Sequence, residues 1–358
     1  MQTNHPAFSF SPTATPGTYA GAETVLHFGH PAAELEALRT GCAAFDLGWR
    51  GKLVVSGEDR VRWLNGMVSN NTRDLGQDHG NYNFVLNAQG RIQSDLVAYQ
   101  RGDFYLLESE AALIPVLREF FERYIIMDDV ELGDISTRLV SLGVGGPKAE
   151  EVLSRAGLVP RGVTLGSMAP GQLADGAWNS SGYTLVKDAV EQRGWYELWL
   201  APENVERVWQ ALLASGAAPA GATALEWQRI LLGLPRMSEM GGKVLPPETG
   251  QDYALHYAKG CYIGQEIVER IHARGQVHRR LMGLVLNGTA PEAGTKLMIG
   301  TGAEAKEAGE LACGAEIEIN GVKHNLALAY VRQEFVKPAV EMNVAGVTAQ
   351  VVTLPFAL

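Results

Sequence analysis

The chain has 358 residues, of which 46% are hydrophobic and 20% are charged, and its formal net charge is −10 at pH 7. This length and composition are typical of a globular protein with two or three domains. The acidic balance argues against extended nucleic-acid binding and against an anionic membrane surface as partner, since both need a basic face.

The chain's cysteines and its N-terminus indicate where it resides. Cys42, Cys261 and Cys313 lie far apart without a CxxC pair, which favours a reducing compartment and predicts no permanent metal site. Residues 1–21 lack the basic start and apolar run of a signal peptide, so we expect a flexible or loosely docked N-terminal arm there. No apolar stretch reaches the ~18 residues of a membrane span. We therefore expect a cytoplasmic protein with no membrane partner.

The first block, residues 22–136, combines helices with hairpins. Hydrophobic periodicity and turn residues predict these elements: helices at 32–40, 60–68 and 111–124, and strands at 51–55, 82–86, 92–99 and 104–108. Strands that follow one another through short turns are typical of an α+β fold rather than of repeated βαβ units.

The second block, residues 137–235, has the same mixed character. The pattern predicts strands at 138–144, 183–187 and 195–200, and helices at 148–155, 204–214 and 224–232. Residues 236–278 form a linker, which has few regular signals up to residue 258 and an apolar helical face at Ile267, Val268 and Ile271. Residues 279–358 have short strand patterns separated by Gly and Pro, which predicts a small β-barrel or sandwich.

The segment Lys-Gly-Cys-Tyr-Ile-Gly-Gln-Glu at residues 259–266 carries the strongest local signal. Two glycines bracket Cys261, which lets the backbone approach another group closely. The ammonium of Lys259 favours a thiolate nearby. The segment therefore predicts a reactive or ligating cysteine, and the alternative is a buried cysteine in a tight structural turn.

Two further sets of side chains are candidates for binding. A run of basic residues follows the cysteine segment: Arg270, His272, Arg274, His278, Arg279 and Arg280. Guanidinium groups suit carboxylates, and the alternative is a solvated loop with ion pairs. Asp95 follows the turn at 87–90 and can bind a ring N–H or act as a base. The alternative is a structural role, in which its side chain stabilises the turn or caps an element.

Taken in order, several segments resemble the glycine-cleavage T-protein superfamily. They are residues 41–47, 51–57, 69–72, 82–90, 95–99, 195–198, 225–235 and 354–356. The resemblance extends from about residue 25 to the end of the chain. Within the superfamily, the octapeptide at 259–266 resembles the motif of the YgfZ branch and its mitochondrial iron–sulfur assembly relatives.

The resemblance implies an α+β fold, in which subdomains form a ring around a central channel that binds tetrahydrofolate, with a C-terminal β-barrel. It implies that Glu197 meets the pterin and that Arg229 meets the folate tail. Further folate contacts implied by the resemblance are Asn70, Tyr82, Arg270 and Arg274. Cys261, Lys259 and Asp95 are the residues it implies for chemistry.

The resemblance also implies a function. We expect a folate-binding protein of the YgfZ type, whose partners are iron–sulfur client or assembly proteins and which supports assembly or repair of their clusters. The alternative is a folate-dependent aminomethyltransferase. The transferases carry paired aspartates where this chain has Ser94 and Asp95, which argues against transfer chemistry. A third possibility is a folate-regulated interaction module without chemistry.

Overall fold

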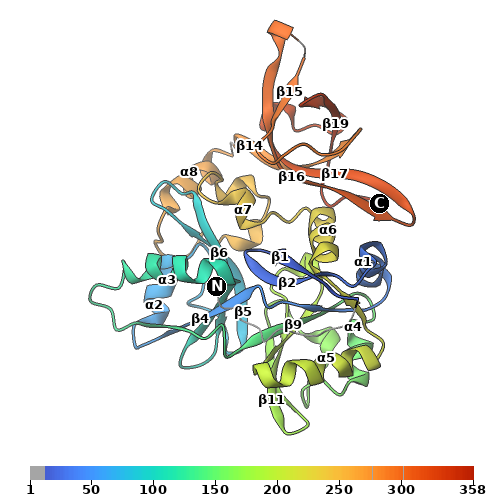
Figure 1. The fold of residues 1–358 in the computed structure, drawn as a ribbon. Helices are drawn as coiled ribbons and strands as arrows, with labels where there is room; N and C mark the ends of the chain where they lie inside the picture. The colour runs from blue at the N-terminus through green and yellow to red at the C-terminus, as the bar shows by residue number, and fades with distance from the viewer. Residues whose placement is uncertain (1–12, 276, 301) are drawn as a thin grey trace. The chain divides into compact units, whose positions relative to one another are not determined.

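The computed structural model describes residues 13–275, 277–300 and 302–358. The chain forms two compact units (Figure 1). Unit 1 comprises residues 1–85, 94–225 and 258–262, and unit 2 comprises residues 86–93, 226–257 and 263–358. In the described ranges, every helix is too short or too polar to cross a membrane.

Unit 1 begins with a hairpin where the sequence predicted a flexible arm. Strand β1 (Thr15–Tyr19) pairs antiparallel with β2 (Ala22–His27). Ala20 and Gly21 close the turn with φ of 51° and 76°, a conformation that glycine adopts readily. The expected flexibility is therefore wrong for residues 15–21, while residues 1–12 lie outside the described part.

The first sheet of unit 1 has five strands in the order β5-β6-β7-β4-β8. These are β4 (Arg50–Ser56), β5 (His79–Leu86), β6 (Ile92–Gln100), β7 (Tyr105–Glu110) and β8 (Glu131–Asp134). Helices α2 (Arg60–Met67) and α3 (Ile114–Glu122) belong to the same region. Residues 111–113 form a 3-10 turn rather than the predicted first turn of the helix, and Pro115 lies in the first turn of α3.

The second sheet of unit 1 has six strands in the order β10-β11-β12-β9-β3-β13. These are β3 (Ala43–Asp46), β9 (Val140–Gly145), β10 (Leu173–Trp178), β11 (Ser181–Lys187), β12 (Tyr196–Leu200) and β13 (Ala218–Ala220). Helices α1 (Pro31–Thr40), α4 (Ala149–Arg155) and α5 (Val205–Ala214) accompany it. β13 pairs parallel with β3, whereas the other pairs are antiparallel.

Alternation along β12 gives the second sheet two different faces. Tyr196 and Leu198 join a hydrophobic core that includes Trp209 of α5. Glu197 and Trp199 lie on the opposite face, where the Trp199 ring meets Tyr99 of β6 edge to face at 4.9 Å. The second face thus contacts the first sheet and carries a buried carboxyl group.

Unit 2 contains most of α6 (Ala222–Leu232), with α7 (Met237–Met240), α8 (Gln265–Arg274) and a closed barrel. The barrel order is β14-β17-β16-β15-β18-β19, seen in orange and red in Figure 1. Its strands are β14 (Arg279–Leu286), β15 (Lys296–Ile299), β16 (Lys306–Ile319), β17 (Val322–Arg332), β18 (Glu341–Val344) and β19 (Val347–Val352). The predicted α+β class and C-terminal barrel are confirmed, whereas the ring and its channel stay predictions.

Candidate functional site

Asp95 and Tyr82 form a hydrogen-bonded pair on neighbouring strands of the first sheet. The hydroxyl of Tyr82 donates to Oδ2 of Asp95 at 2.5 Å. The backbone of Asp95 is fixed as well, because Ser109 and Ser94 donate to its carbonyl oxygen at 2.7 and 3.2 Å. Oδ1 of Asp95 is buried and has no hydrogen-bond partner among the described residues. A buried acceptor without a donor costs free energy, so this oxygen is suited to a ligand's N–H or O–H group.

Lys259 anchors the loop that carries Asn70. Its ammonium donates to the carbonyl oxygens of Val68 and Asn70 at 2.7 and 2.5 Å, and the residue is only 8% exposed. Nδ2 of Asn70 in turn donates to the carbonyl of Tyr82 at 3.1 Å. Burial, and then the charge of Arg73, lowers the pKa of Lys259 to about 7. The predicted partner of Lys259 was Cys261, whereas its hydrogen bonds are made to this loop.

Cys261 is exposed. The neighbouring Tyr262 is buried, and the ammonium of Lys259 lies 5.1 Å from the centre of its ring. The alternative of a buried cysteine in a tight turn therefore does not describe Cys261, although its reactivity stays a prediction. Cys42 is the contrasting case, because burial raises the pKa of its thiol to about 12.

Glu197 belongs to a buried group of charged side chains between the two sheets of unit 1. Lys52 of β4 donates from Nζ to Glu108 Oε1 at 3.1 Å and to the hydroxyl of Ser141 at 2.6 Å. Arg50 approaches the other oxygen of Glu108 at 3.6 Å. Oε2 of Glu197 accepts a hydrogen bond from Trp199 at 3.0 Å.

The two carboxyl groups have opposite ionisation preferences. Burial, followed by the charges of Glu108 and Asp188, raises the pKa of Glu197 to about 8. Burial alone would raise the pKa of Glu108 as well, but Lys52 and Arg50 outweigh it and lower that pKa. At neutral pH Glu197 therefore holds a proton while Glu108 is ionised.

Sequence reasoning found Glu197 but missed Lys52, Glu108 and Arg50. A signal was present, because Lys52 and Glu108 stand beside the apolar runs 53–55 and 105–107, in strands that are buried at most positions. A charge at such a position needs a partner. Nothing local in the sequence shows which charges pair, since the partners come from β4 and β7.

These residues fit a ligand that presents several N–H groups, as the pterin of tetrahydrofolate does. Asp95 offers an unpartnered buried oxygen, whereas Oε2 of the buried Glu197 already accepts from Trp199. Arg50 interacts electrostatically with Glu108, Glu197 and Asp95. The carboxyl groups of Asp95 and Glu197 therefore lie within the electrostatic influence of the same guanidinium group.

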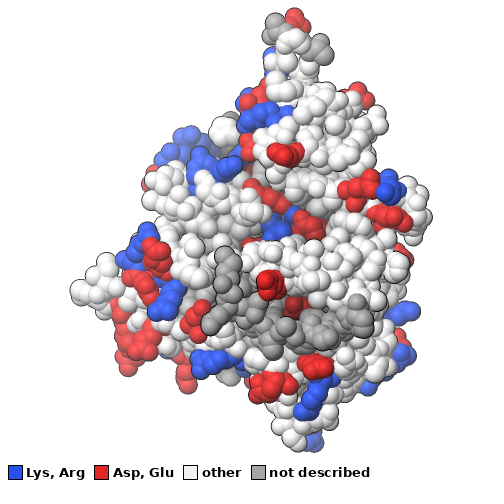
Figure 2. All heavy atoms as spheres, viewed as in Figure 1, with Lys and Arg blue, Asp and Glu red and all other residues white. Residues whose placement is uncertain are grey.

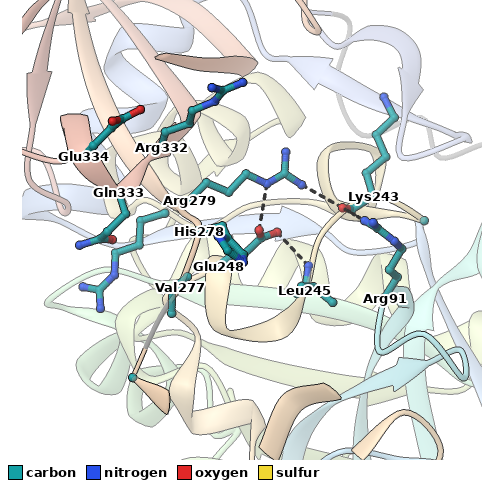
Figure 3. Close-up of a pocket in the computed structure, with 13 residues that line it drawn as sticks. Arg91, Lys243, Leu245, Glu248, Val277, His278, Arg279, Arg332, Gln333 and Glu334 are labelled. Atoms are coloured by element: carbon teal, nitrogen blue, oxygen red, sulfur yellow. Dashed lines mark hydrogen bonds and ion pairs between the residues drawn. The ribbon is translucent and has the colours of Figure 1, made fainter. Parts of the chain in front are cut away.

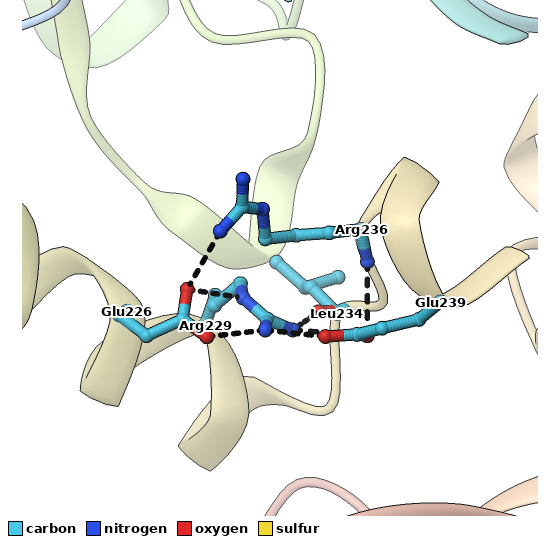
Figure 4. Close-up of polar contacts among 5 residues, drawn as sticks. All are labelled: Glu226, Arg229, Leu234, Arg236 and Glu239. Carbon is cyan, nitrogen blue, oxygen red and sulfur yellow. Dashed lines mark hydrogen bonds and ion pairs between the residues drawn. The ribbon is translucent and has the colours of Figure 1, made fainter. Parts of the chain in front are cut away.

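Arg229, the predicted contact of a folate tail, lies in unit 2 and is fully engaged (Figure 4). Its Nε donates to Glu226 at 2.8 Å, one terminal nitrogen donates to the Leu234 carbonyl at 2.9 Å and to Glu239 at 3.2 Å, and the other binds both glutamates. The five N–H groups of a guanidinium thus all have acceptors. A role in binding folate stays a prediction that requires these contacts to exchange.

Arg270 and Arg274 lie on α8, where Figure 2 shows basic atoms gathered. Arg270 pairs with Glu266 one turn earlier at 2.7 Å, and both side chains are more than half exposed. Arg274 is exposed in the last turn. The alternative of a solvated surface with an ion pair describes Arg270 well, and folate binding by either arginine stays a prediction.

Comparison with known proteins places these features in a family. An aminomethyltransferase of Geobacillus kaustophilus is 28% identical over 355 residues, covering 94% of this chain and 93% of the relative. An aminomethyltransferase of Saccharopolyspora erythraea is 27% identical, covering 96% and 94%. The crystal structure of the glycine cleavage system aminomethyltransferase T from Bartonella henselae superposes with a TM-score of 0.83 at 18% identity, covering 96% of this chain and 94% of that one, which shows a shared fold. The model of the protein family described as the GCVT N-terminal domain matches residues 7–259, and the chain belongs to this family.

Proposed function

We propose that this chain is a tetrahydrofolate-dependent protein of the aminomethyltransferase type, which moves a one-carbon unit from an aminomethyl donor to the folate. The names of its relatives support this function over the iron–sulfur role that the octapeptide first suggested. The observation that carries the proposal is Asp95, whose buried Oδ1 lacks a donor while Tyr82 fixes Oδ2.

In this proposal Asp95 accepts a hydrogen bond or a proton from a nitrogen of the bound molecules. Tyr82 and the two serine contacts to the backbone hold the carboxylate in one orientation, which is the positional control that acid–base catalysis requires. Ser94 supplies no second carboxylate, so Asp95 acts alone. When bound, tetrahydrofolate supplies the nitrogen atoms that receive the one-carbon unit.

Calorimetric titration with tetrahydrofolate tests the binding part of the proposal. We expect wild-type binding to weaken about tenfold or more in Asp95→Asn, because one charge-assisted hydrogen bond is lost. Asp103→Asn is the matched control, since Asp103 is exposed. Absence of binding by the wild type would refute the proposal.

An assay with a methylamine-loaded lipoyl protein tests the transfer part. The wild type and Asp103→Asn should release ammonia in a folate-dependent reaction, and Asp95→Asn should lose at least ~100-fold in rate. Folate binding without any transfer by the wild type would leave the chain a folate-binding protein and overturn the transferase function.

A second candidate function, support of iron–sulfur enzymes, rests on the exposed Cys261 beside its buried anchors Lys259 and Tyr262. It predicts that Cys261→Ser folds normally but fails to restore the activity of cluster-dependent enzymes in a strain lacking the protein. Testing Asp95→Asn in the same strain separates the two functions, because the transferase proposal rests on Asp95 and the iron–sulfur function rests on Cys261. Full restoration by Cys261→Ser would remove the cysteine from the mechanism.

A further inference from the structure

Unit 2 contains a basic pocket of about 1120 Å³ that no residue of the candidate site lines. Its charged lining residues are Arg91, Lys243, Glu248, Arg279, Arg280, Arg332 and Glu334, with His278 beside them (Figure 3). Five lysine and arginine side chains thus face two glutamates, in a chain whose net charge is −10. The volume lies slightly above that of ordinary ligand pockets, which are ~300–1,000 Å³.

Two guanidinium groups of the pocket converge on one oxygen atom. Arg279 donates from Nη2 to the backbone carbonyl of Lys243 at 2.8 Å, and Arg91 donates to the same carbonyl from Nη1. Both contacts are drawn in Figure 3. Two positive charges that share a single neutral acceptor repel each other, so an anion near them is favoured.

The carboxylate that pairs with Arg279 has both of its oxygens engaged. Glu248 accepts from Arg279 Nε through Oε1 at 3.0 Å and from the Leu245 N–H through Oε2 at 3.0 Å. Arg279 is fixed further by stacking over Tyr330, with its guanidinium 5.1 Å from the ring centre. Arg91 makes no ion pair among the described residues and is exposed. The pocket therefore presents an ordered arginine beside one that lacks a carboxylate.

Two further cations of the pocket, Lys243 and Arg332, are held loosely. The ammonium of Lys243 is 4.0 Å from Glu310 and its side chain is 75% exposed. Arg332 is 3.4 Å from Glu307, with its side chain half exposed. Exposed pairs of this kind contribute little to stability. These side chains are free to turn toward a ligand at little cost.

We propose that this pocket binds a ligand that carries two or more carboxylates in series. Guanidinium forks match carboxylates in a bidentate manner, and cations spread around a large hollow suit an extended molecule. Phosphate sites commonly use backbone N–H groups at helix N-termini, whereas here α8 presents its C-terminal Gly275 and the Leu245 N–H already binds Glu248. The two sources of such a ligand are the γ-linked glutamate tail of a folate and an acidic peptide segment.

Titration of the full-length protein with free penta-γ-glutamate, penta-α-glutamate and tripolyphosphate tests the pocket at low ionic strength. We expect saturable binding of at least one pentaglutamate, tighter than tripolyphosphate. Arg91→Gln should weaken it about tenfold or more, because it removes the guanidinium that lacks a carboxylate. Arg118→Gln is the control, since Arg118 is an exposed arginine on α3 in unit 1. Lys243→Gln serves as a second variant, because its exposed side chain is not needed for folding.

A preference for the γ-linked chain would assign the pocket to a folate tail, and this source alone rests on the proposed function. A preference for the α-linked chain would assign it to an acidic peptide. Tighter binding of tripolyphosphate, no saturable binding of either pentaglutamate, or equal weakening in Arg118→Gln would overturn the proposal. Each probe lacks a pterin, so failure here leaves the titration with tetrahydrofolate unaffected.

Discussion

The proton that Glu197 holds at neutral pH makes the stability of unit 1 depend on pH. Its pKa in the folded chain, about 8, lies above the ordinary 4.5 of a glutamate. The stabilising contribution is therefore fully present below about pH 4.5 and is lost as the pH rises through 8. Glu108 has a lowered pKa, so its contribution is lost only as the pH falls below the ordinary value.

Replacement of Glu197 by Gln should flatten the fall in stability between pH 5 and pH 8, because the amide keeps the shape of the neutral acid but does not titrate. Part of the slope remains, since burial also raises the pKa of Asp188. Urea unfolding at pH 5, 6, 7 and 8 measures the effect, with the exposed Glu203→Gln as the control. If the unfolding free energies of the wild type and Glu197→Gln fell in parallel with pH, this prediction would be contradicted.

Lys259→Met should destabilise the protein by about 1–3 kcal/mol, because the carbonyls of Val68 and Asn70 lose a buried donor. Lys148→Met is the control, since Lys148 is exposed. Urea unfolding at pH 6 provides the comparison. An unchanged unfolding free energy for Lys259→Met would show that these hydrogen bonds are dispensable and would restore Lys259 as a possible partner for Cys261.

At the scale of single residues, sequence reasoning identified residue types better than partners. Asp95 and Tyr82 were both expected at the site, and the structure joins them directly. Sequence reasoning did not find the acceptors of Lys259 and Arg229, because a long basic side chain can reach many acceptors. Which acceptor the side chain binds depends on segments far away in the sequence, such as the loop at Val68.

Among the elements, α8 shows how the second glycine of the octapeptide positions a helix. Gly264 precedes α8 with φ of 80°, and a Cβ atom there would lie 2.5 Å from the carbonyl oxygen of Asn87. The close approach requires glycine for two reasons, conformation and space. The turn at 87–90 and the start of α8 therefore pack backbone against backbone.

Gly264→Ala should be more destabilising than Gly250→Ala by about 1–3 kcal/mol. Gly250 has a similar φ of 73° but nothing within 4 Å of its Cβ position, so it isolates the conformational cost. Thermal unfolding followed by circular dichroism measures both variants. Equal losses of stability in the two variants would mean that the turn at 87–90 shifts without a cost in free energy.

Elements with a strong local pattern were predicted well, whereas those defined by distant partners were missed. The strands at 51–55 and 92–99 and the helix at 204–214 match β4, β6 and α5 closely. β3 is buried at all four positions, so it shows no alternation, and β13 has only three residues, one of them Pro219. Their pairing with each other joins segments that are far apart along the chain.

The whole molecule has separate hydrophobic cores in its two units. Leu198 is fully buried in the core beneath the second sheet of unit 1, and Leu297 is fully buried in the barrel of unit 2. The barrel was predicted because short strands with frequent turns leave few other folds. The ring around a folate channel was implied by resemblance and depends on the arrangement of the units.

Calorimetric unfolding should show two transitions, because each unit buries a core of its own. Leu198→Ala and Leu297→Ala should each cost about 2–5 kcal/mol and lower a different transition. The two variants serve as controls for each other. One transition that both variants lower equally would show that the chain unfolds as a single cooperative unit.

The path of the chain limits how the protein can be divided. Both units are built from discontinuous segments. Residues 258–262 belong to unit 1 but follow a segment of unit 2, and residues 86–93 belong to unit 2 but lie between two segments of unit 1. No single proteolytic cut can therefore release either unit as one intact fragment. A gene truncated after residue 225 would encode unit 1 without Lys259, and the loop at Asn70 would lose the ammonium that holds its carbonyl groups.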